Sequence, residues 1–174
     1  MRNICCFLLV IITTSSFSQN LTSGGKLKPE QAIMDVRHYT INLSVNIAEK
    51  SISGYTTIDI ETLQPTRVLV FDLLDSFTIS RITVNNKQQP FTYANKVIAI
   101  TLTEDLQPGR SSVRVDYAGR PHVAIRPPWD DGFTWAKDSY GNAWIAVTAE
   151  GTGGKLYFPC KDHPSDEPNE GADM

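Results

Sequence analysis

The sequence predicts an all-β domain: a β-sandwich of curved antiparallel sheets, followed by a long irregular C-terminal loop region. Apolar residues occupy every second position in several short segments between residues 39 and 117, which is the pattern of half-buried strands. Turn residues separate these segments, and none shows the apolar spacing of an amphipathic helix. From about Gly119 the alternation largely stops, and 119–174 hold all three tryptophans with many of the prolines and glycines.

Glycine, asparagine and proline residues mark where the predicted strands bend or end. Gly54 lies inside an alternating segment and predicts a bulge or a close backbone approach. Asn85-Asn86 predicts a tight hairpin turn, because asparagine tolerates a positive φ. Pro108-Gly109 predicts a further turn. The strands are expected over 39–47, 52–60, 68–71, 77–84, 98–102 and 113–117, with 68–71 apolar throughout and therefore covered on both faces.

The N-terminal residues 1–18 are expected to be a secretory signal peptide rather than part of the fold. Arg2 gives a positive start, 5–12 form a compact apolar run, and Ser16-Phe17-Ser18 supplies the small residues of a cleavage site. The apolar run is too short to span a bilayer, which needs roughly 20 residues. We therefore expect export to the periplasm or the medium, with no transmembrane segment.

The mature chain is expected to hold a flexible leader and one domain. Residues 19–34 are polar, with a Gly-Gly pair and no periodicity, so the leader is assigned to 19–34 and the domain to 35–174. A chain of 174 residues is enough for one domain with its own core.

Composition excludes several classes of function. The formal net charge is −3, and no cluster of lysines or arginines provides a track for phosphates, so nucleic-acid binding is not expected. Removal of the signal peptide leaves Cys160 as the single cysteine, which excludes an internal disulfide and a cysteine-rich zinc site. The three histidines, His38, His122 and His163, lack helical metal-ligand spacing.

The stretch 126–135 is an aromatic, proline-locked loop. We interpret it as a small satellite core in which Trp129 and Trp135 cover one end of the sandwich. The alternative is the rim of a substrate site.

The residues from Glu150 onward carry a resemblance to a known family. Phe158-Pro159-Cys160-Lys161-Asp162-His163-Pro164 matches the pattern aromatic-Pro-Cys-x-Asp-x-Pro. With the loop at 127–133 and the segment 39–54, this pattern resembles the N-terminal domain of the aminopeptidase N family of zinc metallopeptidases, in an exported bacterial branch. The resemblance covers about 35–174.

The resemblance implies a division of labour between two parts of a polypeptide. Family members remove N-terminal residues from peptides with a zinc ion that is held on a later, thermolysin-like domain by His-Glu-x-x-His and a distal glutamate. Neither that motif nor the family's Gly-x-Met-Glu-Asn strand occurs in this sequence. We therefore expect no zinc ligand and no activity here, and a domain that is incomplete at its C-terminus. Its partners would be the missing zinc domain of the same polypeptide and peptide substrates.

Glu150 is the one substrate-binding residue that the resemblance implies. It lies nine positions before Pro159, where the family has a glutamine or glutamate that binds the free α-amine of the peptide. A carboxylate suits an ammonium group because the hydrogen bond is charge-assisted. Without the resemblance, Glu150 reads as a solvated loop carboxylate.

Three residues of the 158–164 segment invite other chemistry. Asp162 and His163 are adjacent, so their side chains point apart, and we expect Asp162 to tie down the loop through backbone N–H groups rather than to bind metal. Cys160 is expected to be a buried structural thiol, since no base or oxyanion site accompanies it.

Two further functions remain open on the sequence alone. One is a non-enzymatic adhesion or carbohydrate-binding module, with Trp129, Trp135 and Trp144 as a stacking platform. The other is the family branch that hydrolyses an epoxide lipid, which nothing in this segment separates from a peptidase.

Overall fold

The computed structural model describes residues 23–164 and 172–173. The expected signal peptide therefore lies outside the described residues. Eleven strands, one short α-helix and one 3-10 turn are distinguished in the described part: α1 Pro29–Ala32, β1 Met34–Asn46, β2 Ser51–Thr62, β3 Thr66–Asp72, β4 Phe77–Val84, β5 Lys87–Gln88, β6 Phe91–Ala94, β7 Val97–Leu106, β8 Gly109–Gly119, β9 Gly132–Lys137, β10 Ala143–Thr148, η1 Gly154–Leu156 and β11 Ala172–Asp173.

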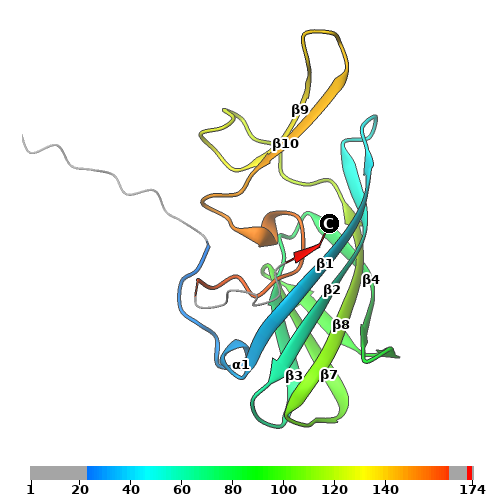
Figure 1. The fold of residues 1–174 in the computed structure, drawn as a ribbon, viewed down its shortest axis with the longest axis vertical. Helices are drawn as coiled ribbons and strands as arrows, with labels where there is room; N and C mark the ends of the chain where they lie inside the picture. Colours follow the sequence, from blue (N-terminus) through cyan, green and yellow to red (C-terminus); the bar gives the residue numbers. More distant parts are fainter. Residues whose placement is uncertain (1–22, 165–171, 174) are drawn as a thin grey trace, which may run out of the picture.

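The strands form two packed sheets and a separate hairpin (Figure 1). The larger sheet has the order β11-β1-β2-β8-β4-β5, and the smaller sheet has the order β3-β7-β6. All pairings within them are antiparallel except that of β1 with β11. The predicted all-β class with curved antiparallel sheets is confirmed.

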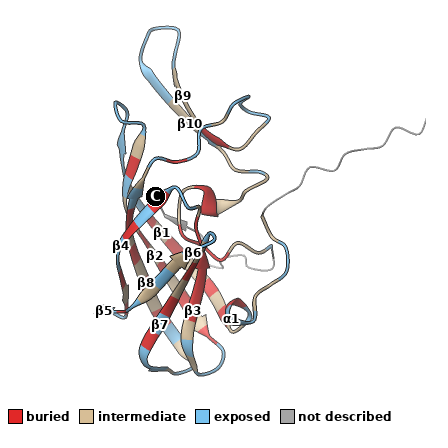
Figure 2. Ribbon diagram, turned by 180° about the vertical axis from the view of Figure 1, so that it is seen from behind, coloured by how far each residue is buried: buried red, intermediate tan, exposed pale blue. Residues whose placement is uncertain are grey.

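The core lies between the two sheets and follows the predicted alternation (Figure 2). On β8, Val113, Val115 and Tyr117 are buried while the residues between them face outward. Ile58 of β2 pairs with Val113, so neighbouring strands present their apolar residues to the same face. From the smaller sheet, the buried contributors include Leu69, Phe71, Ile98, Ile100 and Leu102.

Two local predictions about the backbone are confirmed. Gly54 has a φ of +153°, and a Cβ built on it would lie 2.0 Å from the carbonyl oxygen of Asn42 on β1. Only glycine allows the two strands to approach so closely. Asn85 and Asn86 have φ values of 49° and 65°, which make the tight turn between β4 and β5.

The structure differs from the sequence prediction at both ends of the domain. From Ser23 onward the expected leader has defined partners: 29–32 form α1, and the Gln31 side chain is buried. Polar residues make the contacts of this segment, so its sequence has no hydrophobic periodicity from which they could be predicted. Within the expected irregular region, 132–148 form the β9–β10 hairpin, which projects from one end of the sandwich (Figure 1).

Candidate functional site

A cavity of about 410 Å³ lies where the N-terminal segment meets the loops that follow β10. The segments that line it are far apart in sequence: 23–24, β1, and the chain from Glu150 to Pro164. The lining residues are Ser23, Gly24, Tyr39, Glu150, Gly154, Phe158, Cys160, Lys161, Asp162, His163 and Pro164. The structure thus brings together Glu150, Cys160, Asp162 and His163, the residues of the 150–164 region that the sequence singled out.

Glu150 stands on a closed turn at the rim of this cavity. The N–H of Gly153 donates to the carbonyl of Ala149 at 2.8 Å, which closes the turn around Glu150. Gly153 has a φ of +77°, and a Cβ there would lie 2.3 Å from Asp162 Oδ1. The Glu150 side chain is exposed. Within the described part of the chain, no ion pair or hydrogen bond occupies its carboxylate.

The hallmark segment 158–164 is held against β1 by polar and aromatic contacts. The N–H of Lys161 donates to the Tyr39 hydroxyl at 3.1 Å, and Lys161 Nζ donates to the carbonyl of Met34 at 2.8 Å. Phe158 packs edge-on against Tyr39, with ring centroids 5.5 Å apart. Cys160 is buried and forms no disulfide, as expected for a structural thiol.

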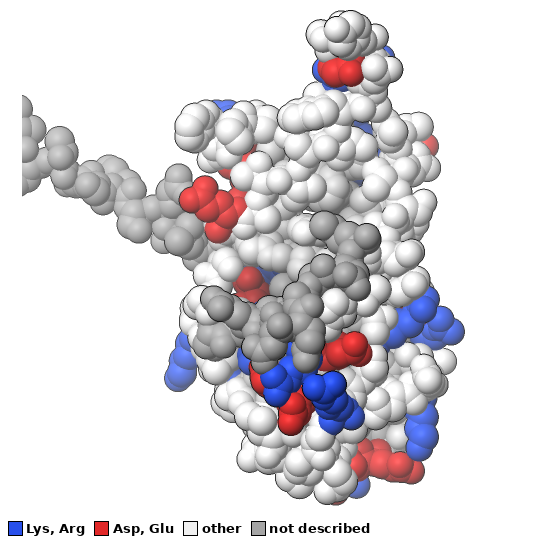
Figure 3. Space-filling model, viewed as in Figure 1, with Lys and Arg blue, Asp and Glu red and all other residues white. Residues whose placement is uncertain are grey.

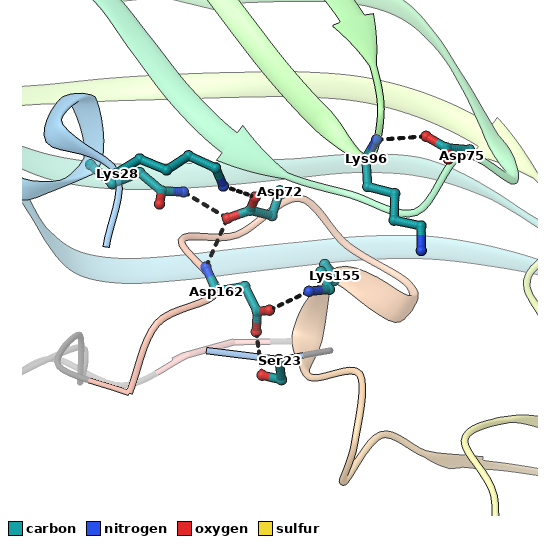
Figure 4. Close-up of polar contacts among 8 residues, drawn as sticks. Ser23, Lys28, Asp72, Asp75, Lys96, Lys155 and Asp162 are labelled. Atoms are coloured by element: carbon teal, nitrogen blue, oxygen red, sulfur yellow. Dashed lines mark hydrogen bonds and ion pairs between the residues drawn. The ribbon is translucent and has the colours of Figure 1, made fainter. Parts of the chain in front are cut away.

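Asp162 is the centre of a polar network of side chains (Figure 4). Ser23 Oγ donates to Asp162 Oδ1 at 2.7 Å, and Lys155 Nζ lies 2.7 Å from Asp162 Oδ2. Both charged side chains are about nine-tenths buried, at 10% and 7% exposed, so each needs the other for neutralisation. Asp162 does tie down the loop, but its carboxylate binds the side chains of Ser23 and Lys155 instead of the expected backbone N–H groups.

Asp72, at the end of β3, is a second buried acid beside this network. Its carboxylate accepts hydrogen bonds from Lys28 Nζ, from Gln31 Nε2 at 2.6 Å and from the N–H of Asp162 at 3.3 Å. The acid therefore joins the N-terminal segment to the hallmark loop, as Figure 4 shows. Figure 3 views the molecule from the same side as Figure 1 and shows acidic and basic side chains next to one another in its lower half.

Burial changes the pKa values of two tyrosines next to the hallmark segment. The Tyr117 hydroxyl donates to the carbonyl of Tyr157 at 2.9 Å. Burial, and next the neighbouring Cys160, raise the pKa of Tyr157 above its ordinary value. Burial also raises the pKa of Tyr117. Both phenols thus stay neutral at physiological pH and act as packing and hydrogen-bonding groups.

The three tryptophans do not share one surface. Trp135 stacks on Phe133 at a centroid distance of 5.6 Å, whereas Trp129 is 81% exposed. Trp144 pairs in register with Ala136, and Trp135 with Ile145, so Trp135 and Trp144 lie on opposite faces of the hairpin. The expected satellite core therefore contains Trp135 but not Trp129, and the platform required for a stacking module is not formed.

Two further findings concern metal binding and membrane-spanning helices. Among residues 23–164 and 172–173, no group of three His, Cys, Asp or Glu side chains is arranged to hold a metal ion, so the residues present do not fit a zinc site. In the same part of the chain, no helix combines the length and the hydropathy needed to cross a membrane.

Sequence reasoning missed the residues that position this loop. Asp131 accepts a hydrogen bond from the N–H of Gly151 at 3.1 Å, and the N–H of Ser23 donates to the Gly151 carbonyl at 3.0 Å. Lys155 and Asp72 were missed too. The position of Asp72 directly after the apolar segment 68–71 is a signal that a charged residue is buried there. The sequence around Ser23 contains no comparable signal of its contact with Asp162.

Comparisons with known proteins agree on one family. The family model described as the peptidase M1 N-terminal domain matches residues 36–168. Aminopeptidase N of Lactobacillus delbrueckii subsp. lactis is 30% identical over 130 residues, which are 73% of this chain and 14% of that protein. The chain therefore spans a small part of the length of this curated relative.

Solved structures give the same picture. An M1 zinc metallopeptidase from Deinococcus radiodurans superposes with a TM-score of 0.61 and 28% identity, covering 76% of this chain and 30% of that chain. A mutant of the Deinococcus enzyme bound to a Tyr-Ser-Ala substrate gives a TM-score of 0.59. Native leukotriene A4 hydrolase from Saccharomyces cerevisiae gives 0.60 at 15% identity over 87% of this chain and 24% of that chain, which is a likeness of fold alone.

Proposed function

This chain belongs to the peptidase M1 N-terminal domain family, and on that premise we propose that it is the N-terminal part of an exported zinc-dependent aminopeptidase. The enzyme removes N-terminal residues from peptides. By analogy with the family, the zinc and its ligands would belong to a further part of the polypeptide; among the described residues, no three His, Cys, Asp or Glu side chains are grouped to hold a metal ion. This part supplies a binding group and a scaffold, and no chemical step.

The observation that carries the proposal is the setting of Glu150. Its carboxylate is exposed at the rim of the 410 Å³ cavity, on a turn whose backbone is fixed. An α-ammonium group that binds there forms a charge-assisted hydrogen bond. Fixing the amine also fixes which peptide bond is presented to the reacting groups, so Glu150 contributes by positioning the substrate.

The exposure of Glu150 explains why a partner domain is needed. An ion pair between exposed groups is worth about 0–1 kcal/mol in water, too little to select a substrate. A docked domain that excludes water would strengthen the same contact. Large apolar side chains are exposed on 123–147, which fits a surface that another part of the enzyme covers. They are Val123, Ile125, Trp129, Tyr140, Trp144 and Val147.

The test uses the complete product of the gene, in which His-Glu-x-x-His is expected within the few hundred residues encoded after Met174. In that product, E150A is expected to lower kcat/KM for leucine p-nitroanilide by about 10²-fold. E104A removes an exposed carboxylate of β7 and is expected to leave the kinetics unchanged. Equal kinetics for E150A and the unaltered enzyme would contradict the role of Glu150.

Two other results would contradict the wider proposal. Residues 19–174 alone, with zinc added, are expected to show no turnover above a buffer blank, so activity of this piece would place catalysis here. A reading frame that stops at 174, or continues as repeated sandwiches, would favour a sugar-binding or adhesion module.

Export is part of the same proposal and has its own test. The order of charge, apolar run and small residues over 1–18 supports it. Protein recovered from the periplasm or medium is expected to begin at Gln19 by N-terminal sequencing. A cytosolic product that retains Met1 or Arg2 would contradict export.

A further inference from the structure

Three consecutive peptide groups around Glu150 are each held by a hydrogen bond. The carbonyl of Ala149 accepts from Gly153 at 2.8 Å, before Glu150. The N–H of Gly151 donates to Asp131 Oδ1 at 3.1 Å, in the peptide that directly follows Glu150. The carbonyl of Gly151 accepts from the N–H of Ser23 at 3.0 Å, in the next peptide. The carboxylate is thus exposed on a backbone with little freedom.

The contacts made by Asp131 and Ser23 come from parts of the chain that are far from Glu150 in sequence. Asp131 belongs to the loop before β9 and approaches the turn from the side of the hairpin. Ser23 belongs to the N-terminal segment, and its hydroxyl also donates to the buried Asp162 at 2.7 Å. Lys155 neutralises that acid at 2.7 Å, so Ser23 is itself anchored to an ion pair inside the protein.

We infer that Asp131 and Ser23 are positioning residues, which clamp the two peptide groups after Glu150 and so fix where its carboxylate meets the substrate's α-ammonium group. This rests on the proposed function of Glu150. Ser23 lies before the residues 36–168 that match the family model, so its role is a feature of this chain rather than of the matched domain.

Packing around the turn supports a fixed geometry. A Cβ on Gly153 would lie 2.3 Å from Asp162 Oδ1 and 2.5 Å from Ser23 Oγ, so the turn, the acid and the serine are in close contact. A turn whose backbone is held in this way needs no reordering when the amine arrives, so only the Glu150 side chain has to adjust. Loosening either clamp lets Glu150 sample other positions and weakens its contact with the substrate.

The first experiment measures the clamp itself and does not depend on any activity. Hydrogen exchange of the Gly151 amide is followed by NMR in the 174-residue chain. D131A is expected to speed this exchange by about tenfold or more, because the amide loses its hydrogen bond to the Asp131 carboxylate. D131N retains an acceptor oxygen and is expected to restore slow exchange. E104A removes one negative charge, as D131A does, and serves as the control. Unchanged exchange in D131A would overturn the clamp.

The second experiment connects the clamp to substrate in the complete gene product. D131A removes the acceptor of the Gly151 N–H, and S23A keeps the Ser23 N–H but loses the hydroxyl that anchors this residue to Asp162. Each is expected to lower kcat/KM on leucine p-nitroanilide by about tenfold, while D131N, S23T and the exposed-site control S139A stay near the unaltered value. A loss in D131A that D131N fails to rescue, or no loss in either alanine variant, would overturn the positioning role.

The two experiments separate the two proposals. If E150A leaves the kinetics unchanged while D131A still speeds exchange at Gly151, then the clamp exists and the function proposed for Glu150 is wrong. If E150A is impaired while D131A leaves the exchange of Gly151 unchanged and both D131A and S23A keep the kinetics of the unaltered enzyme, then the function stands and the positioning role is wrong.

Discussion

Asp72 and Cys160 form an isolated antiparallel bridge that joins the end of β3 to the hallmark loop. The N–H of Asp72 donates to the Cys160 carbonyl at 2.7 Å, and the N–H of Cys160 donates back at 3.0 Å. The same aspartate binds Lys28 and Gln31 through its carboxylate. One residue therefore connects the smaller sheet, the N-terminal segment and the loop that follows Glu150.

Replacement of Asp72 should destabilise the domain. D72A leaves the buried Gln31 amide and the Asp162 N–H without their acceptor, and we expect a loss of about 2–4 kcal/mol in the free energy of unfolding. D72N retains an acceptor oxygen and should lose less. Urea unfolding followed by tryptophan fluorescence measures the difference, with E104A as the control. A loss in D72A no larger than that in E104A would contradict the structural role of the carboxylate.

Gly54 offers a test of backbone contact. G54A places a methyl group 2.0 Å from the Asn42 carbonyl oxygen, so β1 and β2 must separate locally. We expect a loss of about 3 kcal/mol or more. Gly141 also has a positive φ, but a Cβ there meets nothing within 4 Å, so G141A should lose only about 1 kcal/mol. Similar melting temperatures for the two variants would contradict the close approach.

Cys160 should react with thiol reagents only when the domain opens. Its side chain is buried, and the residue is 5% exposed. In a chain with Cys5 and Cys6 replaced by serine, we expect Ellman's reagent to modify Cys160 at least about 10²-fold more slowly in buffer than in 8 M urea. Complete modification of the native protein within minutes would show that the thiol is accessible.

The ion pairs of Asp116, on the outer face of the larger sheet, should make the free energy of unfolding depend on pH in the acid range. Asp116 accepts hydrogen bonds from Arg114 at 2.7 Å and from Arg81 at 3.0 Å. Burial acts to raise the pKa of Asp116, but the hydrogen bonds and charges of the two arginines together lower it below its ordinary value of 3.8. A depressed folded-state pKa stabilises the fold above pH 3.8 and ceases to do so as the pH falls through the folded-state value.

We therefore expect D116N to lose about 1–2 kcal/mol at pH 7, with a difference from the unaltered chain that shrinks as the pH falls below about 4. Urea unfolding at pH 7, pH 4 and about pH 2.5 measures it. E104Q removes a carboxylate that is 80% exposed and should show little difference at any pH. A D116N difference that is constant with pH would contradict the lowered pKa.

The strands were predictable because their signal is local. Tyr39 and Ile41 on β1, and Val113 and Val115 on β8, alternate with outward-facing residues, and this alternation alone assigns each to the buried face. The β9–β10 hairpin was harder to predict. Only 144–147 alternate, and the partner strand interrupts its pattern with aromatic residues, although Gly141-Asn142 is a turn signal in the sequence.

The sequence singled out Glu150, whose role in substrate binding stays a prediction, but it did not single out the residues that hold its turn. The resemblance to the aminopeptidase N family implies Glu150, because it lies nine positions before Pro159, where that family has a glutamine or glutamate. Ser23 is 139 positions from Asp162, and Asp131 is 20 positions from Gly151. No local pattern relates such pairs, because hydrogen bonds between loops leave no periodicity.

The sequence by itself determined the strand pattern, the turn at Asn85-Asn86 and the hallmark segment that points to the family. Each depends on the chemistry of neighbouring residues, which the chain carries whether or not it is folded. Only the tertiary structure decided that Ser23, Asp131 and Asp162 converge on the turn of Glu150. Their meeting depends on how the two sheets and the loops close together, and the free energy of that closure is spread over the whole core.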